Sequence, residues 1–165
     1  MQRVNLILTD KTFLERMRQI EEAEKDRKFC KHGYEHIVDV ARLSYILYLE
    51  NRLKNKDSEI IDKAFIYAAA LLHDIGRFSE FEKFLSHGEA GSVIARGILE
   101  NACFDPDERE IICDAIRRHN EVPRDPDSLT GLLYRADKMS RSCFDCKAYD
   151  ECNWPDDKKN HFLVI

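Results

Sequence analysis

The stretch AALLHDIGRF, from Ala69 to Phe78, decides the fold of this chain. Its first residues end a predicted helix over 59–73 that is apolar almost all round, so we expect this helix at the centre of a helical bundle. Gly76 supplies a natural end to the helix. The imidazole of His73 and the carboxylate of Asp74 therefore leave the predicted core together. A buried carboxylate needs a cation or several hydrogen-bond donors.

Apolar residues at helical spacing predict five further helices, over roughly 12–28, 33–53, 87–100, 106–119 and 129–141. The first is expected to be capped by Thr9 or Thr12, and two others begin at capping-box-like pairs, Ser86 with Glu89 and Asp105 with Glu108. The helix over 33–53 is expected to bury one stripe, formed by Ile37, Val40, Ala41, Ser44, Tyr48 and Leu49. The sequence thus predicts an all-α bundle of about six core helices, followed by an irregular segment over 142–165.

Composition agrees with this fold class and excludes several functions. A length of 165 residues fits one domain, and 6 Gly with 4 Pro are too few for a β-sandwich rich in tight turns. The formal net charge of −5 provides no basic field, so we expect neither duplex nucleic acid nor a membrane as a partner. The apolar run near the start is too short for a signal peptide, and six Cys are too few for a disulfide scaffold. These features predict a cytoplasmic protein.

Six side chains that can bind metal fall where the predicted helices could bring them together. Asp137, for example, lies beside the apolar stripe of its helix, four residues after Leu133. The six are His36, His73, Asp74, His87, His119 and Asp137. Imidazole and carboxylate groups suit Fe, Mn, Co, Ni or Zn. A single His on an apolar helix face is more often a hydrogen-bonded core residue, so the interpretation depends on the whole set.

In these residues the chain closely resembles the HD superfamily of metal-dependent phosphohydrolases. The matching segments are HGYEHIVDVARL, AALLHDIGRF, HGEAGSVIA, AIRRHN and YRADKMSR, which together run from about residue 30 to residue 141. The resemblance implies a single HD domain over 1–165, with residues 142–165 as a Cys-containing extension. It also implies that one divalent metal is held by His36, His73, Asp74 and Asp137. Because His87 and His119 are present too, the chain is similar to members that bind two metals with Asp74 bridging.

The resemblance implies hydrolysis of a phosphomonoester or phosphodiester, in a nucleotide or another small phosphorylated molecule, by a metal-activated water. Asp74, Arg77 and Lys138 are the expected catalytic residues. Arg77, Lys138 and Arg141 are the expected phosphate-binding residues, because guanidinium and ammonium groups pair with phosphate oxygens. The chain departs from one branch of the family, which has Lys in the motif HDxGK where this sequence has Arg77.

Two alternatives remain open at this stage. The same set of four His and two Asp resembles that of mixed-valent di-iron oxygenases with the HD fold, which cleave C–C or C–P bonds with dioxygen. The second alternative is a non-catalytic sensor that binds a nucleotide or metal. Specificity is expected to depend on the segments 78–86 and 120–127.

A second group of metal-ligand residues follows the last predicted helix. Cys143, Cys146 and Cys152 form the pattern C-x2-C-x5-C, and the resemblance places Cys30 near the same pocket as a fourth ligand. A structural zinc ion or an iron-sulfur cluster would order this segment, and a set of reduced thiols is the alternative. Of the remaining Cys and His residues, we expect core thiols at Cys103 and Cys113 and surface or loop positions at His32 and His161.

Overall fold

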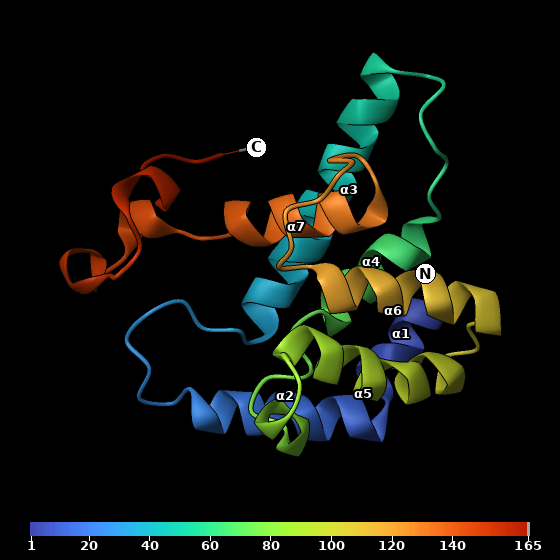
Figure 1. Ribbon diagram of the computed structural model, residues 1–165, viewed down its shortest axis with the longest axis horizontal. Helices are drawn as coiled ribbons and strands as arrows, with labels where there is room; N and C mark the ends of the chain where they lie inside the picture. Colours follow the sequence, from blue (N-terminus) through green and yellow to red (C-terminus); the bar gives the residue numbers. More distant parts are fainter. Residues whose placement is uncertain (165) are drawn as a thin grey trace.

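The computed structural model describes residues 1–164, without the side chains of Glu80 and Glu82, and the described part contains seven α-helices and no strand (Figure 1). The helices are α1 (Gln2–Thr9), α2 (Lys11–Ala23), α3 (Tyr34–Lys54), α4 (Lys63–Leu72), α5 (His87–Asn101), α6 (Pro106–Arg118) and α7 (Leu129–Met139). Short 3-10 turns are η1 (Glu80–Lys83), η2 (Cys143–Asp145), η3 (Tyr149–Glu151) and η4 (Asp156–Lys158). The predicted all-α class is confirmed. Ile165, the last residue of the predicted irregular segment, lies outside the described residues.

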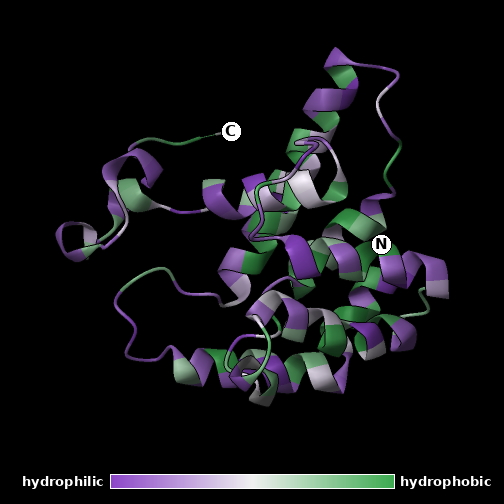
Figure 2. Ribbon diagram, viewed as in Figure 1, coloured by the Kyte–Doolittle hydropathy of each residue, from purple (hydrophilic) through white to green (hydrophobic). Residues whose placement is uncertain are grey.

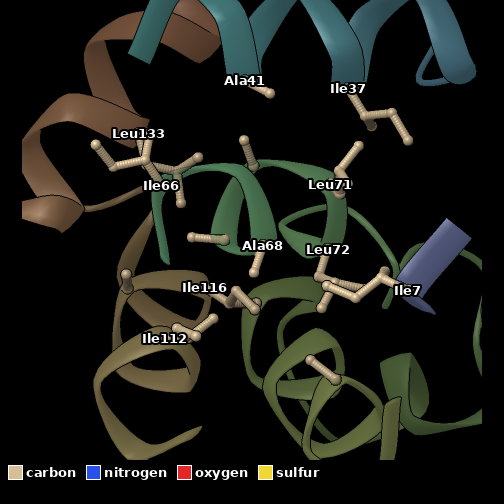
Figure 3. Close-up of a cluster of buried hydrophobic side chains, with 14 of the residues drawn as sticks. Ile7, Ile37, Ala41, Ile66, Ala68, Leu71, Leu72, Ile112, Ile116 and Leu133 are labelled. Carbon is tan, nitrogen blue, oxygen red and sulfur yellow. The ribbon is translucent and has the colours of Figure 1, made fainter. Parts of the chain in front are cut away.

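Helix α4 is the centre of the bundle. It contacts α1, α3, α5, α6 and α7, and Figure 3 shows its side chains lying between Ala41 of α3 and Ile116 of α6. Seven of its ten residues are buried, as expected for a helix that is apolar on most of its surface: Ala64, Ile66, Ala68, Ala69, Ala70, Leu71 and Leu72. Figure 2 shows the same division, with hydrophobic ribbon inside and hydrophilic ribbon outside. The side chains that follow α4 therefore start from the best-packed part of the molecule.

The structure corrects several predicted boundaries. Helix α1 was not predicted. The expected first helix is α2, and its cap is Asp10 instead of Thr9 or Thr12, because the Asp10 carboxylate accepts hydrogen bonds from the backbone N–H groups of Thr12 and Phe13. Helix α2 ends at Ala23 instead of near residue 28. Helix α4 begins at Lys63, after its cap Asp62, instead of at residue 59.

Other details of the helices were predicted with mixed success. Both capping boxes are present, at the starts of α5 and α6. The predicted stripe of α3 is wrong at Leu49, which is 42% exposed, because the helix turns Leu47 into the core instead.

The turn after α4 is held from two sides. Arg16 of α2 donates hydrogen bonds to the carbonyl oxygens of Ile75 and Arg77. On the other side, the backbone of α5 lies so close to Gly76 that a Cβ atom there would be 2.2 Å from the carbonyl oxygen of His87. Only glycine fits this contact, which fixes His73 and Asp74 relative to the first residue of α5.

The segment after α7 extends from the end of that helix on the side of the bundle where the 24–33 loop connects α2 and α3 (Figure 1). It consists of short turns, as predicted. Within the described part of the chain, no helix combines the length and the apolar character needed to cross a lipid bilayer.

Candidate metal centre

Four of the predicted metal ligands meet where α3, the end of α4 and α7 approach one another. The Nε2 atoms of His36 and His73 are 3.2 Å apart, and both face the carboxylate of Asp74. Asp74 Oδ2 lies 3.2 Å from His73 Nε2 and 3.5 Å from His36 Nε2. Asp137 Oδ1 approaches the same pair, 3.5 Å from His36 Nε2 and 4.0 Å from His73 Nε2.

The other two predicted ligands lie on the opposite side of Asp74. His87 opens α5 and His119 caps the end of α6, and their Nε2 atoms are 3.3 Å apart. Each of these nitrogens lies 3.7 Å from Asp74 Oδ1. The two carboxylate oxygens of Asp74 therefore face different pairs of imidazoles.

This arrangement fits metal ions better than it fits a hydrogen-bonded core. Ligand atoms that bind one ion at about 2.1 Å stand about 3.0–3.5 Å apart, close to the spacings on both sides of Asp74. Asp74 is 2% exposed, and neither of its carboxylate oxygens has a hydrogen-bond partner among the described residues. Arg77 Nε lies 2.8 Å from Asp74 Oδ1. This contact is an ion pair, and its angles are not those of a hydrogen bond. A buried carboxylate with this environment is suited to bridging two cations.

Backbone and side-chain contacts orient the imidazoles. The Nδ1 atoms of His73 and His119 lie 2.7 Å and 2.6 Å from the carbonyl oxygens of Ala70 and Ile116. Since a carbonyl only accepts, each Nδ1 carries a proton, and Nε2 is the ring nitrogen that faces Asp74. His36 Nδ1 lies 3.2 Å from the hydroxyl of Ser140.

The imidazoles of the cluster differ in how readily they bind a proton. Burial opposes the charge on Asp74, but the neighbouring His73, His36 and Arg77 hold the pKa of its carboxyl well below the usual value. Burial likewise opposes a proton on His73, and the Asp74 and Asp137 carboxylates overcome it and raise the pKa of His73. Burial and the nearby His73 charge lower the pKa of His119 to about 3. Without metal, His119 is therefore neutral at pH 7, with Nε2 free of a proton.

The structure adds His32 to the surroundings of the site. His32 lies in a loop, which is one of the two expected positions, but it is buried and not at the surface. His32 is 8% exposed, and its Nδ1 lies 2.5 Å from Glu24 Oε1. Its Nε2 lies 3.9 Å from Asp74 Oδ2, on the side of His36. The 24–33 loop has no helical periodicity, so the only local signal for His32 was its place four residues before His36.

The predicted phosphate-binding residues line one large cavity beside the cluster. Arg77, Lys138 and Arg141 all contribute to a cavity of about 850 Å³ that also reaches His36 and Asp137. Lys138 pairs with Asp137, and the Arg141 guanidinium stacks on the Trp154 ring at 4.3 Å.

Asn120 is a further lining residue that the sequence did not single out individually. Its amide nitrogen is 2.8 Å from the Nε2 atoms of both His87 and His119. Of the two segments expected to set specificity, 120–127 contributes Asn120 to this cavity, and none of the described side chains of 78–86 lines it.

The cysteines separate into two groups. Cys30, Cys143, Cys146 and Cys152 all line the cavity described above. Cys113 is buried, as expected, but Cys103 is exposed, so the expected core position of Cys103 is wrong. Cys103 follows the end of α5 with a φ of 62°, and the chain reverses there toward α6. His161 is exposed, as expected.

Comparison with known proteins agrees with this site. The family model of the HD domain matches residues 33–142. An uncharacterized protein of Clostridium beijerinckii is 40% identical over 160 residues, which cover 97% of each chain. Ribonuclease Y of Mycoplasma mycoides is 35% identical over 107 residues, which are 65% of this chain and 22% of that protein. No solved structure gives a significant match. The HD model covers most of the chain and all six predicted ligands, and the chain therefore belongs to the HD-domain family of the metal-dependent phosphohydrolase superfamily.

Proposed function

We propose that this protein hydrolyses a phosphate ester of a nucleotide or another small molecule, with two divalent metal ions held around Asp74. The observation behind this proposal is the Asp74 carboxylate, which is buried between two pairs of imidazoles and has no hydrogen bond to any residue that the structure describes. Fe, Mn, Co, Ni and Zn all suit these ligands. Such ions supply a water of lowered pKa and positive charge for the phosphate oxygens.

The candidate ligands form two groups, one for each ion. His36, His73 and Asp137 would hold one ion, and His87 with His119 would hold the other. Asp74 would contribute one oxygen to each position, since Oδ2 faces the first pair of imidazoles and Oδ1 the second. The carbonyl oxygens that accept from His73 and His119 keep these rings in the tautomer that ligands need.

The cavity supports a phosphorylated substrate of nucleotide size. Its volume of about 850 Å³ is within the range of small-molecule sites. Arg77 and Lys138 stand next to the ligands Asp74 and Asp137, where they would bind phosphate oxygens and hold the ester in line for attack. Tyr34 and Trp154 line the same cavity and offer rings on which a nucleobase could stack.

The similarity to ribonuclease Y supports a phosphoester as the scissile group. The net charge of −5 makes a short or single nucleotide a better substrate than a long polynucleotide.

A direct test is a screen of nucleotides and other phosphate esters with the metal-free protein, to which Mn, Co, Ni, Zn or anaerobic Fe(II) is added separately. We expect phosphate or nucleotide release that requires metal and is unaffected by the removal of dioxygen. Asp74→Asn should abolish it, whereas Asp57→Asn, in the exposed loop after α3, should leave it unchanged.

Two results would overturn the proposal. Turnover that requires both iron and dioxygen, with no phosphate ester cleaved, would establish the oxygenase alternative. Nucleotide binding without turnover under every metal tested, with the same binding in Asp74→Asn, would indicate a sensor.

A further inference from the structure

Three cysteines lie in a segment that has almost no apolar core of its own. Between residues 142 and 164 only Ala148 is buried, and the segment contains only three short 3-10 turns. Its large apolar side chains are exposed: Phe144 by 51%, Trp154 by 43%, Phe162 by 80% and Leu163 by 77%. Hydrophobic burial therefore contributes little to the folding of this segment.

Although its large apolar side chains are exposed, this segment partly buries its three cysteines. Cys143, Cys146 and Cys152 are each partly buried, while most of the residues around them are exposed. All three line the cavity beside the HD cluster, on the same wall as Arg141 and Trp154. Cysteine thiolates are ligands of structural zinc sites and iron-sulfur clusters, and such a group would order a segment that has no apolar core.

The fourth thiol that lines the cavity belongs to a different part of the sequence. Cys30 belongs to the 24–33 loop, and this loop is joined to the C-terminal segment by an ion pair of 2.9 Å between Lys28 and Glu151. Cys30 is exposed but lines the cavity, and its surroundings there, with the nearby thiols of Cys143 and Cys146, raise the pKa of its own thiol. Cys30 is thus a neighbour of the other thiols although it lies more than 100 residues before them in the sequence.

The contacts that now hold the segment are few and polar. The Asn160 side-chain amide donates to the carbonyl oxygens of Lys138, Met139 and Arg141 at 2.9, 3.2 and 2.9 Å. These bonds anchor one point of the segment to the end of α7. The stretch with the three cysteines is joined to the 24–33 loop by the ion pair between Lys28 and Glu151, whose side chains are both exposed.

We propose that Cys30, Cys143, Cys146 and Cys152 bind one thiolate-coordinated metal group, a zinc ion or an iron-sulfur cluster, which joins the C-terminal segment to the 24–33 loop. Each thiol releases its proton to solvent, and four sulfur–metal bonds form. Four thiolates complete a closed coordination shell, so the group is structural and takes no part in hydrolysis. It fixes the wall of the cavity that carries Arg141 and Trp154.

The site is chemically separate from the one around Asp74. Thiolates select zinc or iron-sulfur clusters, whereas mixed imidazole and carboxylate ligands also accept manganese, cobalt and nickel. Metal binding by the four cysteines can therefore be tested independently of the phosphohydrolase activity.

Elemental analysis of anaerobically purified full-length protein tests the proposal. Cys146→Ser and Cys152→Ser should each lose one metal group, seen as zinc or as iron with acid-labile sulfide, and keep the metal bound around Asp74. Asp74→Ala should show the reverse loss. Cys103→Ser is the matched control, because Cys103 is exposed and outside the cavity, and it should keep the full content. Unchanged content in both Cys146→Ser and Cys152→Ser would overturn the proposal.

A measurement on the unmodified chain covers the case in which these variants fail to fold. The metal-free protein is reloaded with Co(II), and sulfur-to-cobalt charge-transfer absorption is recorded next to the spectrum of the protein as purified. We expect either this absorption or the visible bands of an iron-sulfur cluster, together with protection of four thiols from alkylation. If neither absorption occurs and all the thiols except Cys113 react equally with and without metal, the proposal is wrong.

Discussion

Glu24 holds His32 with both of its carboxylate oxygens. Oε2 accepts the backbone N–H of His32 at 2.6 Å, and Oε1 accepts Nδ1 at 2.5 Å. Both residues are buried, at 2% and 8% exposure. Because an ionised carboxylate only accepts hydrogen bonds, the proton of His32 is on Nδ1, and Nε2 faces Asp74. A carboxylate that fixes an imidazole in this way is a common partner of metal-binding histidines.

Replacing Glu24 should therefore weaken both the fold and the metal site. Glu24→Ala leaves two buried donors of His32 without an acceptor, which we expect to lower the free energy of unfolding by about 1–3 kcal/mol. Metal affinity should also fall, because His32 Nε2 would no longer be held 3.9 Å from Asp74 Oδ2. Urea unfolding of the metal-free protein and metal titration measure the two effects separately. Glu22→Ala removes only an exposed pair with Lys25 and should change neither. Equal values for the two variants would contradict the prediction.

Removal of metal should destabilise the protein through Asp74. The two imidazole pairs and Asp137 bring charged and polar groups together in the core, and bound ions offset their desolvation. With metal at about 100 times its dissociation constant, binding contributes about 2.7 kcal/mol. We expect chelation to lower the thermal midpoint by about 5–10 °C.

The matched comparison is the same chelation experiment on Asp74→Ala. This variant should show a much smaller shift, because only the thiolate site remains to lose its metal. Asp57→Asn should keep the full shift. Identical shifts for the wild type and Asp74→Ala would show that these ligands bind no stabilising ion.

The parts of the fold that were predictable from the sequence are those determined by neighbours in the chain. The apolar surface of α4 and the two capping boxes depend on residues within one or two turns, and all were found from local spacing. Helix α1 was not predicted, because its apolar run is short, and the cap Asp10 was missed because Thr9 and Thr12 are alternative cap residues close to it. Cys103 was predicted to be buried, but it is exposed. Burial after the end of a helix depends on the direction that the chain takes, and at Cys103 the chain reverses its direction with a φ of 62°.

The metal centre was predictable only in part, for a similar reason. The order of its six candidate ligands matches a family pattern, and the structure brings the other five around Asp74. Glu24, His32 and Asn120 belong to no such pattern. Glu24 and His32 meet because the 24–33 loop folds back over the end of α4, and Asn120 reaches His87 from the turn after α6. Contacts of this kind depend on tertiary packing, which residue spacing does not encode.

Gly76 is expected to tolerate no side chain. A Cβ atom there would lie 2.2 Å from the carbonyl oxygen of His87 and 2.3 Å from the amide nitrogen of Gly91, and both are backbone atoms. Gly76→Ala must push α5 away from the turn, so we expect a loss of about 3 kcal/mol or more in the free energy of unfolding. The displacement also carries His87 away from Asp74, so metal affinity should fall.

Gly97, which lies in α5, provides the control. A Cβ atom at Gly97 meets no atom within 4 Å, so Gly97→Ala should raise the free energy of unfolding by about 0.5–1 kcal/mol through helix propensity. Urea unfolding measures both variants. A loss for Gly76→Ala no larger than the change for Gly97→Ala would show that the close contact between the turn and α5 is not rigid.

The stability of the metal-free protein should depend on pH through His119. Its pKa is lowered from 6.5 to about 3 by burial and by the charge of His73, so between these values the unfolded chain binds more protons than the folded chain. The free energy of unfolding should therefore rise with pH across this window, by at most about 1.4 kcal/mol per pH unit for one proton. His32, whose pKa burial also lowers, acts in the same sense. His73 acts in the opposite sense above pH 6.5, because its raised pKa gives stability that is lost as the pH rises. Urea unfolding from pH 4 to pH 6.5 should show a smaller slope for His119→Asn, and a slope equal to that of the wild type would contradict the assignment.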